Sequence, residues 1–270
     1  GKSMIAKRLQ YILPPMKTEE VLDRAKLQVL DSQEPNFTPH RGMRSPHHSS
    51  TLASIFGGGS HNARIGEVGL AHGGILFFDE LPHFSKNVLE SLREPMEDGK
   101  IRISRVNSKV EYPADFLFIG AMNPCPCGSL LNDAKECRCS ELEIKRYKNK
   151  LSDPFIDRID LCVVMQNVKA KDEGSCSSKE LHKMVVQAHM YAKQRGQSVF
   201  NAKLDDSDIE KFCILSDEAK ETLNIAIARF DLSFRGIKKV QKVSRTIADL
   251  DTSQYIEKHH LLEAFSYRRR

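Results

Sequence analysis

The stretch Gly74-Ile75-Leu76-Phe77-Phe78-Asp79-Glu80 decides the fold class of this chain. Four consecutive apolar residues that end at two carboxylates are typical of a buried strand in a parallel sheet, whose carboxyl end borders a site. A second apolar run over 116–121 ends at Met122-Asn123, and a third covers 157–164. Helical patterns separate these runs, so the sequence predicts an α/β fold with a parallel sheet.

Two domains are expected from the patterns around these strands. Residues 169–179 (KAKDEGSCSSK) are polar and contain Gly and Ser, which is typical of a linker between an α/β core over 1–168 and an all-helical region over 180–270. Residues 31–71 read as a long loop or hairpin insertion, of a length typical of functional loops. The other expected elements are helices over 1–14, 18–30, 84–98, 180–195, 207–213, 216–230, 235–248 and 259–267 and a β-hairpin over 100–118.

The composition of the 270 residues is that of a globular protein, with 40% hydrophobic and 29% charged residues. It excludes a wholly disordered or fibrous chain. No apolar run approaches the roughly 20 residues of a membrane span, so no membrane partner is expected. The amino terminus lacks the apolar core of a signal peptide. Seven cysteines without an export signal therefore favour reduced thiols and a cytoplasmic location.

Charge is distributed unevenly along the chain, whose formal net charge is +5. Residues 229–270 contain ten basic and five acidic side chains, whereas residues 67–98 contain two basic and seven acidic ones. A basic end and an acidic middle fit a surface for a polyanion beside a metal or phosphate site. The alternative is a solvated helical face with a tail.

The first three residues, Gly1-Lys2-Ser3, match the end of a phosphate-binding loop, G-x-x-x-x-G-K-[ST], and a helical pattern follows them. In such a loop the helix N-terminus faces the phosphates, the Lys binds the β- and γ-phosphates, and the hydroxyl binds Mg²⁺. The alternative is an accidental tripeptide or a cloning remnant. The upstream glycines and the strand before them are missing from this sequence, so we expect a fragment truncated at this loop.

Asp79-Glu80 after its apolar strand has the Walker B pattern, in which the Asp holds the Mg²⁺ shell and the Glu polarises the attacking water. The alternative is a pair of acids that caps a helix. Asn123, at the end of the next strand, could hold the same water. Arg158 and Arg235 are each candidates for a guanidinium that stabilises charge on the γ-phosphate, although a lone Arg is more often a surface residue.

Four of the seven cysteines form two close pairs, Cys125-x-Cys127 and Cys137-x-Cys139. Four thiolates can close a tetrahedral Zn²⁺ site, which would pin a loop next to Asn123. The alternatives are reduced loop cysteines and an iron–sulfur cluster. His47-His48 are further candidate ligands, but a loop pair that hydrogen-bonds its surroundings is the expected role.

Five stretches together resemble one family. The chain is similar to the magnesium-chelatase-like AAA+ ATPases of the YifB/ComM group, which are relatives of the magnesium chelatase AAA+ subunit and, more distantly, of MCM helicases. The resemblance spans nearly the whole chain. The stretches that carry it are RSPHHSSTLASIFGGG (44–59), IGEVGLAHGGILFFDELPHF (65–84), LREPMEDGKIRISR (92–105), AMNPCPCG (121–128) and SFRGIKKVQKVSRTIADL (233–250).

The resemblance implies a P-loop AAA+ three-layer core with a parallel sheet that lacks its first strand, and a small C-terminal helical lid. It implies a helix-2 insertion over about 40–70 and a pre-sensor-1 hairpin over 100–113. It also implies ATP and Mg²⁺ as cofactors and a homo-oligomeric ring, usually a hexamer, with the nucleotide between subunits. The implied roles are Walker A for Gly1, Lys2 and Ser3, Walker B for Asp79 and Glu80, sensor 1 for Asn123, arginine finger for Arg158 and sensor 2 for Arg235.

The hairpin tip carries Arg105 and Lys109, which in a ring would face the pore and grip a phosphate backbone without reading bases. The alternative is a solvated hairpin. The resemblance implies ATP hydrolysis that moves DNA strands, as in branch migration during DNA uptake. The alternatives are remodelling of a protein partner, as in the chelatase subunit, and a non-catalytic interaction module. The Lon-like amino-terminal domain usual in the family is absent from this sequence.

Overall fold

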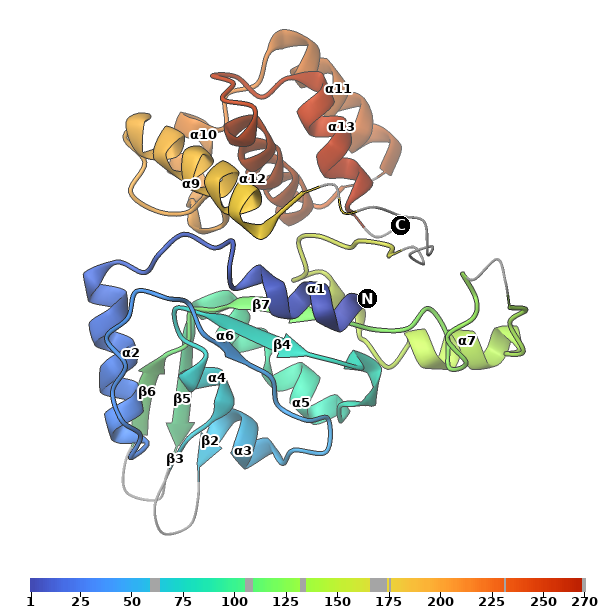
Figure 1. Ribbon diagram of the computed structural model, residues 1–270. Helices are drawn as coiled ribbons and strands as arrows, with labels where there is room; N and C mark the ends of the chain where they lie inside the picture. Colours follow the sequence, from blue (N-terminus) through green and yellow to red (C-terminus); the bar gives the residue numbers. More distant parts are fainter. Residues whose placement is uncertain are drawn as a thin grey trace. The chain divides into compact units, whose positions relative to one another are not determined.

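A computed structural model describes residues 1–58, 64–104, 109–131, 135–165, 174, 176–230 and 232–268 of the chain (Figure 1). Its contacts divide it into two units. Unit 1 comprises Gly1–Arg158 and Met165–Glu173, and unit 2 comprises Ile159–Val164 and Gly174–Arg270. Unit 1 combines helices with a parallel sheet and unit 2 is helical, which confirms the predicted mixture of an α/β part and a helical part.

The sheet of unit 1 has three parallel strands in the order β1 (Met43–Arg44), β4 (Ile75–Phe78) and β7 (Leu117–Gly120). Both β4 and β7 were expected, and their parallel pairing brings their carboxyl ends to the same edge of the sheet. Asp79 and Asn123 follow these two ends. The fold therefore gathers at one edge the polar residues that the sequence places after two separate strands.

The strand β4 is buried on both faces, with all four side chains at most 1% exposed. Its register pairs Phe77 with Ile119 and Phe78 with Gly120. Phe77 and Ile119 pack with Ala6 on one face of the sheet. On the other face the Phe78 ring stacks on Phe84, with 4.1 Å between ring centroids. Each such buried side chain stabilises the fold by about 1.5–3 kcal/mol, which explains why the run is continuously apolar.

Helices surround the sheet of unit 1 (Figure 1). The helix expected over 84–98 is interrupted: α5 (Lys86–Ser91) ends before Leu92, and α6 (Arg93–Asp98) begins after it. Pro95 explains the interruption, because a proline has no N–H to donate within a continuous helix but fits a first turn. The remaining elements are α1 (Lys2–Leu9), α2 (Thr18–Leu30), α3 (Leu52–Phe56), β2 (Gly57–Gly58), β3 (Arg64–Ile65), α4 (Glu67–Leu70), η1 (Leu81–His83), β5 (Lys100–Ser104), β6 (Lys109–Pro113), α7 (Glu141–Lys148) and α8 (Asp153–Ile156).

The described residues of the segment 31–71, which was expected to be one long loop or hairpin, form short elements that arginine contacts hold in place. Arg24 is buried and donates hydrogen bonds to the carbonyls of Asn36, Thr38 and His40. Arg41 is also buried and donates to the carbonyls of Pro14 and Gly73, while it pairs with Glu20 at 3.0 Å. These guanidinium groups satisfy backbone carbonyls that no strand or helix pairs, and so fix the chain that leads into β1.

The strand expected over 157–164 is wrong. Asp157 is the C-cap of α8, and residues 159–165 have no regular structure. A strand needs a neighbour for its backbone hydrogen bonds, and among the described residues β7 forms the edge of the sheet with β4 as its one partner. Within unit 2 the Cys162 N–H instead donates to the Tyr267 carbonyl at 2.7 Å, and Val164 is 71% exposed.

Unit 2 consists of helices packed around α12 (Phe234–Leu250), as the sequence predicts (Figure 1). The α12 side chains Val240, Ile247 and Ala248 lie in its core. The other elements are α9 (Ser178–Gln194), η2 (Asn201–Lys203), α10 (Asp206–Phe212), α11 (Asp217–Phe230) and α13 (Lys258–Ser266). No helix in the described part of the chain is both long and apolar enough to cross a bilayer.

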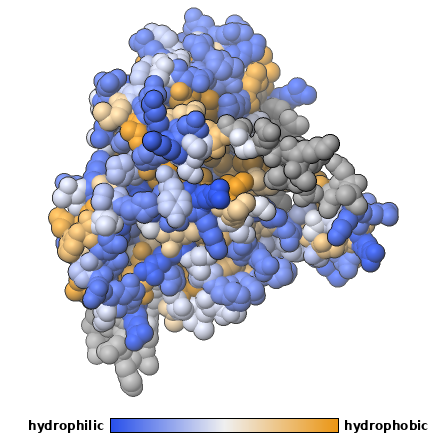
Figure 2. Space-filling view, viewed as in Figure 1, coloured by the Kyte–Doolittle hydropathy of each residue, from blue (hydrophilic) through white to orange (hydrophobic). Residues whose placement is uncertain are grey.

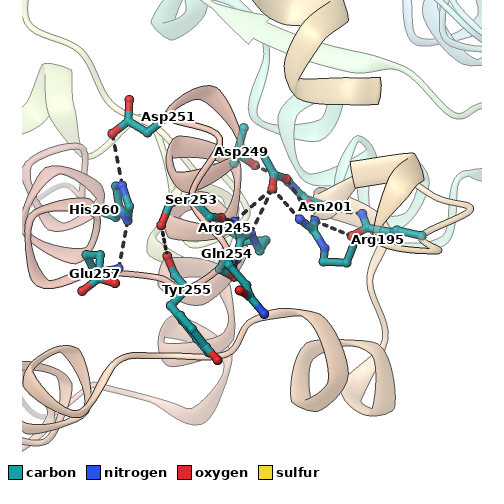
Figure 3. A network of polar contacts seen from close by, with 12 residues as sticks. Arg195, Asn201, Arg245, Asp249, Asp251, Ser253, Gln254, Tyr255, Glu257 and His260 are labelled. Atoms are coloured by element: carbon teal, nitrogen blue, oxygen red, sulfur yellow. Dashed lines mark hydrogen bonds and ion pairs between the residues drawn. The ribbon is translucent and has the colours of Figure 1, made fainter. Parts of the chain in front are cut away.

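A buried polar network centred on Asp249 holds the helices of unit 2 together (Figure 3). The two carboxylate oxygens of Asp249, which is 1% exposed, accept hydrogen bonds from Arg245, Arg195 and Asn201 at 2.6–3.1 Å. Arg245 is fully buried and also donates to the carbonyls of Ser253 and Gln254. Burial lowers the pKa of Arg245 and the adjacent carboxylate counteracts this, so the guanidinium depends on its partners.

Candidate functional site

Polar side chains from three separate segments meet at the carboxyl edge of the sheet in unit 1. The Lys2 Nζ donates to the Asn123 Oδ1 at 3.0 Å, across 121 positions of sequence. The Ser3 hydroxyl donates to the Asp79 Oδ2 at 2.6 Å, across 76 positions. The structure thus brings together the predicted residues from the start of α1, the end of β4 and the end of β7. We call Lys2, Ser3, Asp79 and Asn123 the edge cluster.

The position of α1 makes the edge cluster suitable for an anion. Gly1 is the N-cap of α1, and Lys2 and Ser3 lie in its first turn. The N–H groups of a first turn have no partner within the helix and carry partial positive charge. Together with the Lys2 ammonium group they favour a bound phosphate. The buried Ala6 fixes the helix on the sheet, so its N-terminus is held at the carboxyl edge.

A constrained turn directs the two acids that follow β4. The Asp79 Oδ1 accepts a hydrogen bond from the Glu80 N–H at 3.0 Å. Glu80 has a φ of 52°, in the left-handed region, where a non-glycine residue costs about 1–3 kcal/mol. The turn is held by the Leu81 N–H, which donates to the Ala121 carbonyl at 2.9 Å. Strain of this kind is concentrated at functional sites, and here it leaves the Glu80 side chain 57% exposed.

His48 is a neighbour of Glu80 that the sequence analysis treated as part of a loop pair. Its Nδ1 lies 3.7 Å from the Glu80 Oε2, an ion pair when the imidazole is protonated. His47 bonds Ser49 through its Nδ1 at 2.7 Å, as expected for a loop histidine. Glu80 therefore has an imidazole beside it, which adjacent sequence could not reveal because His48 and Glu80 lie in different segments.

Tyr147 is a second residue that the sequence analysis missed. It lies in α7, is 6% exposed and forms a hydrogen bond with the backbone of Asn123. Burial raises the pKa of its hydroxyl, while this hydrogen bond counteracts the rise. A Cβ added to Gly128 would lie 3.8 Å from the Asn123 Cγ, so the turn after Asn123 passes close to its side chain. Asn123 is thus supported from α7 and from the turn that follows it.

Neither candidate arginine belongs to the edge cluster, because Arg158 bonds other residues of unit 1 and Arg235 is part of unit 2. Arg158 donates from Nη2 to the Glu97 Oε2 and from Nη1 to the Pro154 carbonyl, both within unit 1. Arg235 is exposed in the first turn of α12, in unit 2. Arg105 lies outside the described residues. Lys109 begins β6, but its side chain is not among those described.

The four predicted cysteines form one group. The Sγ atom of Cys125 lies 3.4 Å from that of Cys127 and 3.7 Å from that of Cys137, and Cys127 and Cys137 are 3.6 Å apart. Including Cys139, all four sulfurs lie within 4.8 Å of one another. The backbone amides of Ser129 and Arg138 lower the pKa of Cys127 to about 5. This cluster is held as thiols rather than disulfides.

An open groove of about 670 Å³ runs from the edge cluster along α1. Figure 2 shows hydrophilic side chains with some hydrophobic ones in this region of the surface. The groove combines a hydroxyl at one end with basic and aromatic groups, a lining that suits an anionic ligand with an apolar part. The residues that line it include Ser3, Lys7, Arg8, Tyr11, Met43 and Ser45.

Comparison with known proteins covers almost the whole chain. The family described as "Magnesium chelatase, subunit ChlI" matches residues 1–173, and "Magnesium chelatase, subunit ChlI C-terminal" matches residues 175–268. The join between the two matches lies inside the predicted linker. Both units of the structure are therefore accounted for by one kind of protein.

Individual relatives agree with this assignment. YifB of Salmonella typhimurium is 40% identical over 99% of this chain and 54% of its own length. The competence protein ComM of Haemophilus influenzae is 39% identical over 99% of this chain and 53% of its own length. An uncharacterised Mycobacterium bovis protein is 36% identical over 93% of this chain. The chain spans about half the length of the curated relatives it matches. It belongs to the magnesium chelatase subunit ChlI family, in which it matches YifB and ComM proteins.

Proposed function

We propose that this protein is a P-loop AAA+ ATPase that binds ATP with Mg²⁺ at the edge cluster and hydrolyses the γ-phosphate. The observation that carries the proposal is the convergence of Lys2 on Asn123 and of Ser3 on Asp79, at 3.0 and 2.6 Å. Lysine and hydroxyl at a helix start, facing an acid and an amide at strand ends, are the groups that ATP hydrolysis requires.

The donor set of the edge cluster fits both proposed ligands. The Ser3 hydroxyl and the Asp79 carboxylate offer oxygen ligands, which Mg²⁺ prefers, and they already lie within one hydrogen bond of each other. The Lys2 ammonium group and the N–H groups of the first turn of α1 suit the phosphates. Bound Mg²⁺ would neutralise charge on the β- and γ-phosphoryl oxygens.

The other tasks of ATP hydrolysis, which are to orient the water and to hold the phosphate, fall to side chains of the protein. Glu80 orients and polarises the attacking water, because its carboxylate is exposed beside Asp79 rather than consumed in a buried ion pair. Asn123 holds this water from the end of β7, and Lys2, which lies 3.0 Å from the Asn123 Oδ1, holds the phosphate. These groups act by position and by charge, and no covalent intermediate with the protein is needed.

Arg158 is proposed as an arginine finger that acts on the nucleotide of a neighbouring subunit, and Arg235 as a sensor-2 arginine. The hydrogen bonds of Arg158 to Glu97 and Pro154 support a role outside its own edge cluster. This role requires a homo-oligomeric ring, for which a hexamer is the proposed form. A monomer would then hydrolyse ATP slowly.

The work proposed for the motor is movement of DNA strands, in the manner of a helicase or branch-migration enzyme. The 39% identity to a competence protein supports it, as does the basic composition of residues 229–270. Arg105 and Lys109 are the proposed contacts with the phosphate backbone. The second candidate is remodelling of a protein partner, which the match to the magnesium chelatase subunit supports. The clustered cysteines add a proposed structural Zn²⁺ to the cofactors.

ATPase rates of the full-length protein with single-stranded DNA, with branched DNA and without DNA separate these candidates. A DNA-acting motor is expected to turn over faster with DNA, and the stimulation should fall steeply with salt because phosphate contacts release counterions. Indifference to DNA together with stimulation by a protein partner would favour remodelling. Absence of turnover under all conditions would refute the ATPase proposal.

A further inference from the structure

We infer that Cys125, Cys127, Cys137 and Cys139 form a structural Zn²⁺ site that holds Asn123 in its working position; the second half of this inference rests on the proposed ATPase function. Four thiolates at Zn–S distances of about 2.3 Å place their sulfurs about 3.8 Å apart at the corners of a tetrahedron. The sulfurs of Cys125, Cys127 and Cys137 lie 3.4, 3.6 and 3.7 Å from one another. A disulfide would need about 2.05 Å, so the sulfurs are not paired covalently, and their spacing matches that of ligands around an ion.

Two local structures bring the sulfurs together from separate parts of the loop. Gly128 has a φ of +79° and donates its N–H to the Cys125 carbonyl at 3.0 Å, which curls the chain so that Cys125 and Cys127 face each other. Cys139 directly precedes Ser140, the N-cap of α7, which forms a reciprocal capping box with Glu143. A turn and a helix cap thus fix the two ligand pairs.

The chain offers a useful contrast in unit 2, where Asp251, His259 and His260 also gather within 4.8 Å. There the Glu257 N–H donates to the His260 Nδ1 at 2.9 Å, so the neutral ring carries its proton on Nε2 and donates it to the Asp251 Oδ2 at 3.1 Å (Figure 3). A proton already occupies the position that a metal would need. In the cysteine cluster the sulfurs instead contact one another, and an ion would replace their thiol protons.

The cysteine site connects directly to the edge cluster. Asn123 precedes the first ligand, Cys125, by two residues, and a Cβ added to Gly128 in the first ligand turn would come into van der Waals contact with the Asn123 side chain. Tyr147, on the helix that begins just after the last ligand, bonds the Asn123 backbone. Asn123 in turn accepts the hydrogen bond from Lys2. The ion therefore ties together both supports of Asn123. With four protein ligands it has no open coordination position and takes no part in the chemistry.

Metal content is the first measurement. The full-length protein should contain about one zinc per chain by elemental analysis. Cys137→Ser should lower this value at least tenfold, whereas the control Cys176→Ser, an exposed cysteine outside the cluster, should keep it. Because Cys137→Ser can unfold the loop, a chelated and Co²⁺-reconstituted sample provides a second readout, the visible spectrum of tetrahedral cobalt thiolate. Iron in place of zinc, no metal, or zinc retained in Cys137→Ser would overturn the site.

Hydrogen exchange and nucleotide binding test the link to Asn123. On zinc removal, amide protection should fall in residues 121–128 and 141–148, and affinity for a non-hydrolysable ATP analogue should fall by about tenfold, the value of one hydrogen bond to a charged group. Restored zinc should restore both. Unchanged protection would overturn the coupling. If zinc removal lowers the amide protection but the zinc-loaded protein binds no nucleotide in the presence of Mg²⁺, the ATPase proposal fails while the metal site stands.

Discussion

The edge cluster of unit 1 and the Asp249 network of unit 2 use similar side chains in opposite ways. Asp249 and Arg245 are at most 1% exposed, and each is surrounded by donors or acceptors from the same unit. In the edge cluster Asn123 is exposed, and Glu80 next to it is 57% exposed. Buried charges of this kind depend on their partners, because an uncompensated buried charge is strongly destabilising. Polar groups that converge while they are still partly exposed remain available for a ligand.

The largest expected effect is on stability and falls on unit 2. Asp249→Ala leaves Arg245 and Arg195 near each other without their common carboxylate, and an uncompensated buried charge costs about 3–5 kcal/mol. The free energy of unfolding, measured with urea, should fall by about that amount. Asp217→Ala is the matched control, because it removes an exposed ion pair with Lys220 and should cost less than about 0.5 kcal/mol. Equal losses of unfolding free energy in the two variants would show that the buried network is no more important for stability than an exposed ion pair.

The next effect falls on catalysis and leaves stability nearly unchanged. Glu80→Gln should reduce ATP hydrolysis about 10²–10⁴-fold, the usual contribution of a general base, while nucleotide binding persists. Because the Glu80 side chain is exposed, the substitution should change the free energy of unfolding of the protein by less than about 1 kcal/mol. Single-turnover hydrolysis and a urea titration measure the two values. Normal turnover in Glu80→Gln would remove this residue from the mechanism.

A smaller effect is expected at Tyr147, a buried side chain of unit 1 next to Asn123. Tyr147→Phe keeps the buried ring and removes the hydroxyl that bonds the Asn123 backbone. The loss should be about 0.5–1.5 kcal/mol in stability, with a several-fold weaker affinity for an ATP analogue. The comparison variant Tyr255→Phe changes an exposed ring in unit 2 and should leave that affinity unchanged. Equal affinities in both variants would mean that Asn123 does not depend on α7.

The smallest effect is a pH dependence shared by the two units. His72 and His260 each accept a backbone N–H at Nδ1, from Asp115 and Glu257, and burial lowers the pKa of both imidazoles. As the pH falls, these histidines are therefore protonated in the unfolded chain before they are protonated in the folded protein. Their full contribution to the free energy of unfolding is present above about pH 6.5 and declines as the pH falls toward the folded pKa values. Urea midpoints at pH 7.5 and 5.5 measure the decline. His260→Gln should reduce it, and an unchanged decline would exclude His260 as a cause.

The sequence predicted the edge of the sheet because the chemistry there is local. The apolar run before Asp79 and the run before Asn123 are each readable alone, and parallel pairing brings their ends together. The strand expected over 157–164 failed because a strand is defined by a neighbour, which no local pattern contains. The sequence did not predict a role for Tyr147 or His48 at the site, for a related reason. Each acts through a contact with a residue distant in sequence, and neither has a distinctive motif around it.

The central claim is that Lys2 and its partners bind the triphosphate of ATP. Calorimetric titration of the full-length protein with a non-hydrolysable ATP analogue and Mg²⁺ tests it most directly, with Lys2→Met as the variant. Loss of the charged contact with the phosphates is expected to weaken binding by about 10²-fold, while the urea midpoint stays within error, because Lys2 is partly exposed and contributes one hydrogen bond to the fold. Equal affinity of the two proteins for the analogue would contradict the account.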